Sequence, residues 1–284
     1  MECIADVGAT LGEGPVWDPR EAALYWLDIP ERRLFRWSAT DGTRTVALSH
    51  HVCSLLPRAS GGFIGGGYDG FVAVAPDFTV TPAGQPEPGL PGNRFNDGKL
   101  DRAGRLWAGT MDRAEATDSG SLYRLDVDLR WHLVDTGYRV TNGPAFSRDG
   151  RTLYHSDSAR QIVYAFDLDA DGTASNRRVH LRFGDGDGYP DGMTVDADNC
   201  LWIAFWDGWC VRRFAASGEQ IDARPVPVQR PTSCTFGGAD LDQLFITSAS
   251  RDLTPAERVA QPLAGGLFMV RPGVCGVADR PFSG

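Results

Sequence analysis

Residues Tyr189-Pro190-Asp191-Gly192-Met193 form a pattern that returns along the chain. Similar stretches are Glu13-Gly14-Pro15, Asn96-Asp97-Gly98 and Asn142-Gly143-Pro144. Each places an oxygen-bearing side chain beside a glycine and precedes a strand-like run. One such stretch predicts only a turn, because Asx-Gly pairs form turns readily. Four of them at matching places in successive repeats predict ligands that converge on one point.

The spacing of apolar runs predicts a repeat fold. A polar turn with Asp or Gly precedes each run, as before Leu106-Trp107 and Leu201-Trp202. The runs begin at Leu24, Phe63, Leu106, Leu153, Leu201 and Leu244. They are about 40 to 50 residues apart, which is the size of a four-stranded propeller blade. We therefore expect an all-β chain that forms a six-bladed β-propeller over residues 1–284, as a single domain with four antiparallel strands per blade.

Two other architectures fit the sequence less well. A TIM barrel needs eight long helices, and no stretch of this chain has a sustained helical period of apolar residues. A β-sandwich is compatible with many short strands but predicts no regular sixfold spacing. The 34 glycines and 18 prolines are typical of short strands joined by turns.

The composition limits the partners. The net charge of -9 argues against nucleic acid and anionic membranes, because both need a basic surface. No apolar run approaches the ~18 residues of a membrane helix, and MECIADVGAT lacks the features of a signal peptide. The six cysteines include no C-x-x-C pair, so we expect reduced thiols and a cytoplasmic protein. A monomer or small homo-oligomer is expected.

Three oxygen-bearing residues predict a metal site. Glu13, Asn142 and Asp191 each lie about ten residues before an apolar run, where propeller strands surround the mouth of the central channel. Two carboxylates and an amide oxygen suit Ca²⁺, Mg²⁺ or Mn²⁺, and could also bind Zn²⁺ or Fe²⁺ with waters. We therefore predict that these residues bind one divalent metal ion. Cys53 and Cys234 have the same spacing but, as small buried residues, need no role.

Other motifs are interpreted as structural. Asp167, Asp169 and Asp171 resemble the start of an EF-hand loop, but Arg178 stands where that loop needs glutamate, so a hairpin turn is expected. The loops after the apolar runs add Asp28 and Asp157 to the candidate rim of the channel. The chain has no H-x-x-x-H, G-x-S-x-G or phosphate-loop motif.

The four glycine stretches, with Gly109-Thr110-Met111 and Gly120-Ser121-Leu122-Tyr123, resemble the signature set of the SMP-30/gluconolactonase/regucalcin-like family. The resemblance runs from about residue 9 to about residue 270. It implies a six-bladed propeller with one divalent metal bound by Glu13, Asn142 and Asp191. It also implies that Arg94 and Asn96 contact the substrate. Some members use a glutamate just after Gly-Thr-Met, for which this chain has no clear counterpart.

The resemblance implies hydrolysis of a sugar lactone, such as xylono-, arabino- or gluconolactone, to the aldonic acid. The metal would stabilise the developing oxyanion, and Asp191 would accept a proton from the attacking water. The alternative is a Ca²⁺-binding regulatory propeller without catalysis, which would use the same ligands. A propeller that binds only proteins is a third hypothesis, and it predicts an exposed apolar rim.

Overall fold

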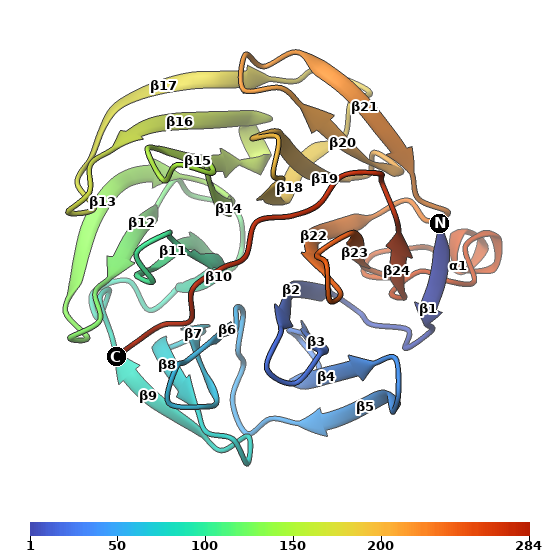
Figure 1. The fold of residues 1–284 in the computed structure, drawn as a ribbon, viewed down its shortest axis with the longest axis horizontal. Coiled ribbons are helices and arrows are strands. Elements are labelled where there is room, and N and C mark those ends of the chain that lie inside the picture. The colour runs from blue at the N-terminus through green and yellow to red at the C-terminus, as the bar shows by residue number, and fades with distance from the viewer. The chain divides into compact units, whose positions relative to one another are not determined.

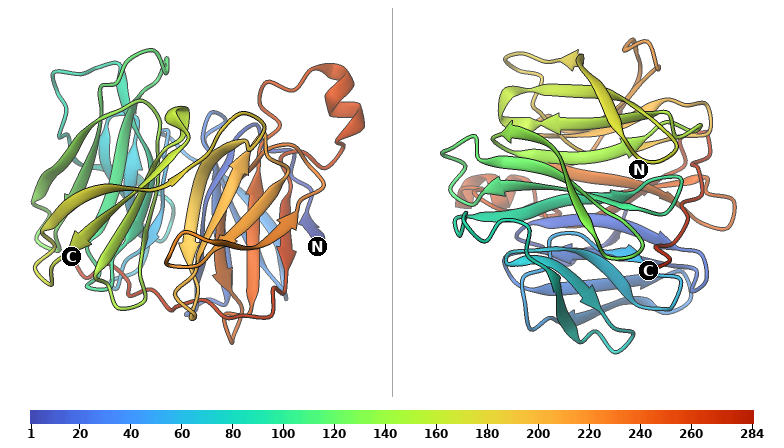
Figure 2. Two further views of the ribbon diagram at one scale, coloured as in Figure 1. Left: turned by 90° about the horizontal axis from the view of Figure 1, so that it is seen from above. Right: turned by 90° about the vertical axis from the view of Figure 1, so that its left-hand side faces the viewer.

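The computed structural model describes all residues from Met1 to Gly284. Six four-stranded antiparallel sheets make up a six-bladed β-propeller, which confirms the predicted fold class. The only helices are the 3₁₀ turn η1 (Ser158–Arg160) and α1 (Pro255–Ala260), which projects beyond the strands of its own unit in Figure 2. None of the helices is long and apolar enough to cross a membrane.

The sheets divide between two compact units. The first unit comprises Met1–Ala47 and Phe183–Val277. One of its sheets contains β2 (Gly12–Asp18), β3 (Ala23–Asp28), β4 (Arg33–Ser38) and β5 (Gly42–Ala47). The next contains β18 (Tyr189–Val195), β19 (Leu201–Trp206), β20 (Cys210–Phe214) and β21 (Gln220–Pro225). The third contains β22 (Pro231–Gly237), β23 (Gln243–Ser248), β24 (Leu267–Val270) and β1 (Glu2–Ala5).

The second unit comprises Leu48–Arg182 and Ala278–Gly284. Its first sheet contains β6 (Leu56–Pro57), β7 (Phe63–Gly67), β8 (Gly70–Val74) and β9 (Val80–Gly84). Its second contains β10 (Asn93–Leu100), β11 (Leu106–Asp112), β12 (Gly120–Leu125) and β13 (Trp131–Tyr138). Its third contains β14 (Thr141–Phe146), β15 (Thr152–Asp157), β16 (Ile162–Leu168) and β17 (Ala174–Arg182). That the six sheets form a single domain stays a prediction.

Strands far apart in the sequence complete the third sheet of the first unit. β1 pairs antiparallel with β24, with Glu2 opposite Met269 and Cys3 opposite Phe268. The two strands lie side by side in Figure 1. Ala5 of β1 and Leu267 of β24 belong to one apolar cluster with Trp26. The sheet is therefore completed by a strand from the opposite end of the sequence.

Buried aspartates hold the turn between the first and second strands of two sheets. Asp101 accepts a 2.9 Å hydrogen bond from the indole of Trp107, and Asp196 accepts a 2.8 Å bond from Trp202. Both indoles are fully buried. A buried indole N–H needs a hydrogen-bond acceptor, so the aspartate allows tryptophan to fill the core at this position.

The first strand of most sheets carries a register shift near its start. The shifts lie between Glu13 and Val16 in β2, between Phe95 and Gly98 in β10, between Asn142 and Ala145 in β14, and between Pro190 and Met193 in β18. A β-bulge redirects the side chains next to it and is common beside active sites. The four glycine stretches identified in the sequence therefore coincide with four bulges.

Candidate functional site

Three of the residues predicted for the site form a hydrogen-bonded row in the second unit. Arg94 donates from Nη1 to the Oδ1 of Asn96 across 2.6 Å. Asn96 in turn donates from Nδ2 to the Oδ1 of Asn142 across 2.9 Å. The side chains of the three residues are buried, with 7%, 8% and 4% of their residue surface exposed. The predicted substrate-binding pair is thus joined directly to one predicted metal ligand.

Neighbouring groups fix which way both amides point. The Nδ2 of Asn96 also donates to the backbone carbonyl of Thr141 across 2.7 Å, and the Nδ2 of Asn142 donates to the Oγ of Ser158 across 2.8 Å. Both amide oxygens therefore face the row. An amide oxygen has two lone pairs, so the Oδ1 of Asn142 can accept from Asn96 and still bind a cation.

Asp157 positions the strand that carries Asn142. Its carboxylate accepts hydrogen bonds from the backbone N–H groups of Arg139 and Val140 and forms a 3.0 Å ion pair with Arg160. Asp157 is completely buried. The sequence placed Asp157 among the candidates for the channel rim. In the structure its carboxylate binds the backbone of the segment that precedes Asn142, so its role is structural.

Asp28 repeats this arrangement in the first unit. Its two oxygens accept hydrogen bonds from the backbone N–H groups of Thr10 and Leu11, at 3.0 and 3.1 Å. Arg33 forms a 2.5 Å ion pair with the same carboxylate. Leu11 lies two residues before Glu13, as Val140 lies two residues before Asn142. A buried aspartate therefore fixes the backbone just before two of the predicted metal ligands, Glu13 and Asn142.

Glu13 and Asp191 lie on strands that both flank β22 in the first unit. Thr232 donates from Oγ1 to the carbonyl of Gly12, the residue before Glu13, across 2.5 Å. A Cβ atom on Gly192, the residue after Asp191, would lie 2.1 Å from the Oγ of Ser233. Consecutive residues of β22 therefore set the backbone next to each carboxylate.

The chemistry of these residues fits a divalent cation that prefers oxygen. Glu13 and Asp191 are 7% and 5% exposed, and carboxylates at such depth need a cation or hydrogen-bond donors. The chain has no cluster of three or more His, Cys, Asp or Glu side chains suited to a metal, so the set depends on the amide of Asn142. Glu13 and Asp191 belong to one unit and Asn142 to the other, and their joint binding of one ion stays a prediction.

Asp97 is an ionisable group next to the row. Burial raises its pKa to about 6, while the charge of Lys99 and the backbone N–H groups of Gly98 and Gly143 act in the opposite direction. The N–H of Gly98 donates to its Oδ1 across 2.7 Å. Lys99 is the only lysine of the chain. Asp97 can therefore change its charge in the mildly acidic range beside Asn96.

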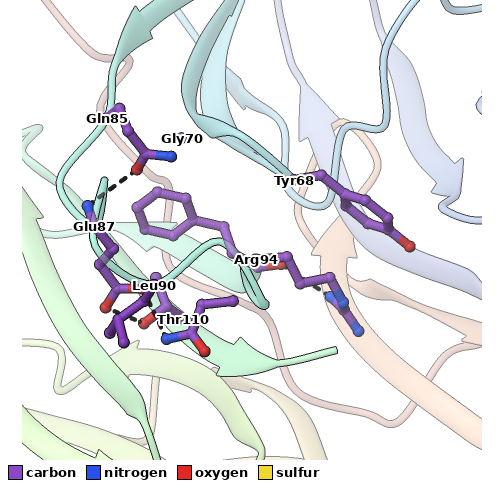
Figure 3. A pocket seen from close by; sticks show the side chains of 9 residues that line it. Tyr68, Gly70, Gln85, Glu87, Leu90, Arg94 and Thr110 are labelled. Carbon is purple, nitrogen blue, oxygen red and sulfur yellow. Dashed lines mark hydrogen bonds between the residues drawn. The ribbon is translucent and has the colours of Figure 1, made fainter. Parts of the chain in front are cut away.

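A pocket of the second unit lies next to Arg94. Its lining includes Tyr68, Glu87, Arg94 and Thr110. Glu87 accepts hydrogen bonds from three neutral donors, Asn93, Thr110 and Tyr123. These three neutral side chains hold its carboxylate in place. Figure 3 shows the side chain of Arg94 extending toward Tyr68 and away from Glu87. Sequence reasoning missed Tyr68 and Glu87, because neither lies in a recognisable motif.

The structure contains the predicted hairpin turn between β16 and β17. The Asp167–Asp171 stretch belongs to a hairpin turn between β16 and β17, closed by a 2.9 Å bond from the N–H of Gly172 to the carbonyl of Asp169, as predicted.

The residue of β22 that matches Asn142 in strand register is Thr232, since Pro231 pairs with Ser248 as Thr141 pairs with Asp157. Cys234, which the sequence spacing indicated, lies two residues further along.

Comparison with known proteins identifies the family of the chain. A family profile described as "SMP-30/Gluconolactonase/LRE-like region" matches residues 11–250. The chain is 36% identical to a 6-deoxy-6-sulfogluconolactonase of Pseudomonas putida, over 100% of this chain and 99% of that protein. It is 35% identical to the pentonolactonase XacC of Haloferax volcanii, over 88% of this chain and 85% of that protein.

A solved structure of similar fold is that of a calcium-binding protein, regucalcin, from Agrobacterium tumefaciens. The TM-score is 0.94 at 28% identity, and the match covers 99% of this chain and 96% of that one. Fold and sequence together define a six-bladed propeller of the lactonase and regucalcin type. The chain belongs to the SMP-30/gluconolactonase/LRE-like family.

Proposed function

We propose that this protein is a sugar lactonase that hydrolyses an aldonolactone to the aldonic acid with the help of one divalent metal ion. The hydrogen-bonded row Arg94–Asn96–Asn142 carries the proposal, because it joins donors for sugar hydroxyls to a ligand for a cation. The lactonase names of two relatives support the same reaction class.

The candidate metal ligands are Glu13, Asn142 and Asp191. A divalent cation bound by their oxygens would polarise the lactone carbonyl and lower the pKa of water, whichever of Ca²⁺, Zn²⁺, Mn²⁺, Mg²⁺ or Fe²⁺ it is. The calcium-binding description of the related regucalcin supports a divalent ion. Asp28 and Asp157 act indirectly, because they hold the backbone that precedes two of these ligands.

Side chains of the protein transfer the proton and bind the substrate. Asp191 accepts a proton from the attacking water, whose oxygen forms a bond to the carbonyl carbon. The ring C–O bond then breaks, and the ring oxygen takes up a proton and leaves as a hydroxyl group of the aldonate. Arg94 donates to sugar oxygens from its planar guanidinium and aligns the carbonyl, and Asn96, whose two N–H groups are already engaged, accepts from a sugar hydroxyl at its Oδ1.

The decisive experiment measures metal content and lactone hydrolysis together. Wild-type protein is loaded with each metal in turn, and acid release is followed for glucono-, xylono- and arabinolactone. We expect turnover well above the metal-only blank and about one ion per chain. Asp191→Asn should lose at least about a hundredfold in kcat, whereas Asp240→Asn, an exposed aspartate, should retain wild-type rates.

Two results would contradict the proposal in different ways. Near-normal turnover of Asp191→Asn with its metal bound would remove the role of this residue as a base. Tight binding of calcium without hydrolysis of any lactone would favour the second candidate, a regulatory Ca²⁺-binding propeller. The name of the related regucalcin keeps that candidate open.

A further inference from the structure

Two arginines of the second unit lie against the same aromatic ring. The guanidinium carbon of Arg94 is 5.7 Å from the centre of the Tyr68 ring, and that of Arg113 is 5.8 Å from it. Both distances are within the range of a cation–π contact. His51 stacks on the same ring at 4.2 Å with an angle of 12° between the planes, which holds Tyr68 in place. We call Tyr68, Arg94 and Arg113 the arginine pair site.

The charge of Arg94 has no acidic partner within the protein. Arg94 is the only buried arginine of the chain. Its Nη1 donates to the Oδ1 of Asn96, to the carbonyl of Phe95 and to the thiol of Cys53. None of these three groups is a carboxylate. No carboxylate lies within ion-pair distance of it, although 17 of the other arginines have one. Burying a cation without a counter-charge is costly, so this position favours an anionic ligand.

Arg113 is fixed in the same way by neutral groups. Its Nη2 donates to the carbonyl of Pro91 across 2.7 Å, and its Nε donates to the carbonyl of Gly92 across 3.2 Å. The neighbouring Asp112 forms no ion pair with it, and the carboxylate of Asp112 instead accepts from the backbone N–H groups of the loop at 114, 116 and 117. Arg113 is therefore an oriented cation that retains its charge.

We infer that the arginine pair site binds an anionic substituent of the lactone, a sulfonate, phosphate or carboxylate group remote from the reacting carbonyl. The inference rests on the proposed lactonase function and adds the substrate class. Arg94 links the two ends of the site, since its row leads through Asn96 to Asn142. The lactone carbonyl lies at the Asn142 end, and the anionic group lies at the Tyr68 end.

A neutral sugar lactone would leave the charge of the buried Arg94 uncompensated, whereas the exposed guanidinium of Arg113 remains in contact with water and adds a second set of donors at the edge of the site. An anionic group supplies several oxygens to the planar donor sets of the two guanidiniums, in hydrogen bonds strengthened by charge. The protein as a whole carries a net charge of -9, which repels anions at long range. A local pair of arginines is therefore what an anionic substrate needs in order to bind this chain.

The test compares matched lactones that differ in one substituent. Rates of acid release are measured for gluconolactone and for its 6-phospho, 6-sulfo and 6-carboxylate counterparts, with wild type and Arg113→Gln. We expect wild type to prefer at least one anionic lactone by about tenfold or more in kcat/KM. Arg113→Gln should lose about ten- to hundredfold on that substrate and stay within about twofold on gluconolactone. The three anionic lactones identify which group is bound.

Arg182→Gln serves as the matched control, because Arg182 is an exposed arginine of the same unit without an ion pair. It should leave all rates unchanged. Equal loss of both substrate types in Arg113→Gln, or no loss of either, would overturn the inference. Thermal unfolding of each variant verifies that it is folded, and Tyr68→Leu provides a second variant that leaves the backbone contacts of Arg113 in place.

Failure of the lactonase proposal would give a different pattern. If no lactone is hydrolysed, calorimetric titration with inorganic sulfate and phosphate still tests the arginine pair site. Binding that is weakened at least about tenfold in Arg113→Gln and unchanged in Arg182→Gln supports it. No anion binding by the wild type, or equal binding by all three proteins, contradicts it.

Discussion

The Nδ2 of Asn96 lies 2.9 Å from the Oδ1 of Asn142, although 46 positions separate the two residues in the chain. The bond joins the first strands of two neighbouring sheets, β10 and β14. Both strands have a register shift at this point, so the two bulges turn the amides toward each other. A predicted substrate contact and a predicted metal ligand are thus coupled, and changes in one should affect the other.

Replacing Asn96 with alanine should weaken metal binding and catalysis together. The change removes the donor to Asn142 and the acceptor for Arg94, and loss of a residue that orients a ligand costs about ten- to hundredfold in metal affinity. Titration calorimetry with the activating metal and kcat/KM for the best lactone measure both effects. Asn176→Ala, which removes an exposed asparagine, should change neither; normal metal affinity in Asn96→Ala would refute the coupling.

Asp157→Asn should destabilise the strand that carries Asn142. The substitution keeps the size of the side chain but removes a buried charge that accepts two backbone N–H groups and pairs with Arg160. We expect a loss of about 2–3 kcal/mol in the free energy of unfolding, measured in urea. Asp118 pairs with the same Arg160 but is exposed, so Asp118→Asn should cost less than about 1 kcal/mol. Equal losses in the two variants would count against a positioning role.

Gly192→Ala should displace Asp191. The added methyl group would lie 2.1 Å from the Oγ and 2.4 Å from the Cβ of Ser233, so the backbone of β18 or β22 has to move. Overpacking of this kind costs about 1–3 kcal/mol in stability, and we expect metal content to fall as well. Ser233→Gly in the same chain should restore part of both. Gly89→Ala has open space around its methyl group and should behave as wild type.

His155 should make stability depend on pH. Burial lowers its pKa from 6.5 to about 3, with a smaller contribution from Arg177. The unfolded chain therefore binds a proton that the folded chain does not, and stability falls as pH drops below about 6.5, by about 1.4 kcal/mol per unit. His155→Leu should remove about 2 kcal/mol of the difference in unfolding free energy between pH 7.5 and pH 5. His50→Gln, at an exposed site without an ion pair, should leave that difference intact.

The spacing of the apolar runs was enough to predict the six sheets, because each turn with Asp or Gly ends one strand and begins the next. The same spacing led to Cys234 where the register gives Thr232, because the turn from Phe236 to its partner Leu244 is longer than the corresponding turn from Phe146 to Leu153, and counting back along the sequence does not reveal this. The contacts of Arg113 with Tyr68 could not be predicted either. They join different sheets, and their geometry depends on strand twist and loop conformation, which no local pattern encodes.

The pairing of Glu2–Ala5 with Leu267–Val270 makes the order of synthesis matter. Glu2–Ala5 is synthesised long before Leu267–Val270 and stays unpaired until that partner strand has been made. Its unsatisfied N–H and C=O groups are a template for mispairing during that time. Moving this segment to follow residue 270 in a rearranged gene would place both partners in one hairpin, and the nascent chain should then aggregate less during expression.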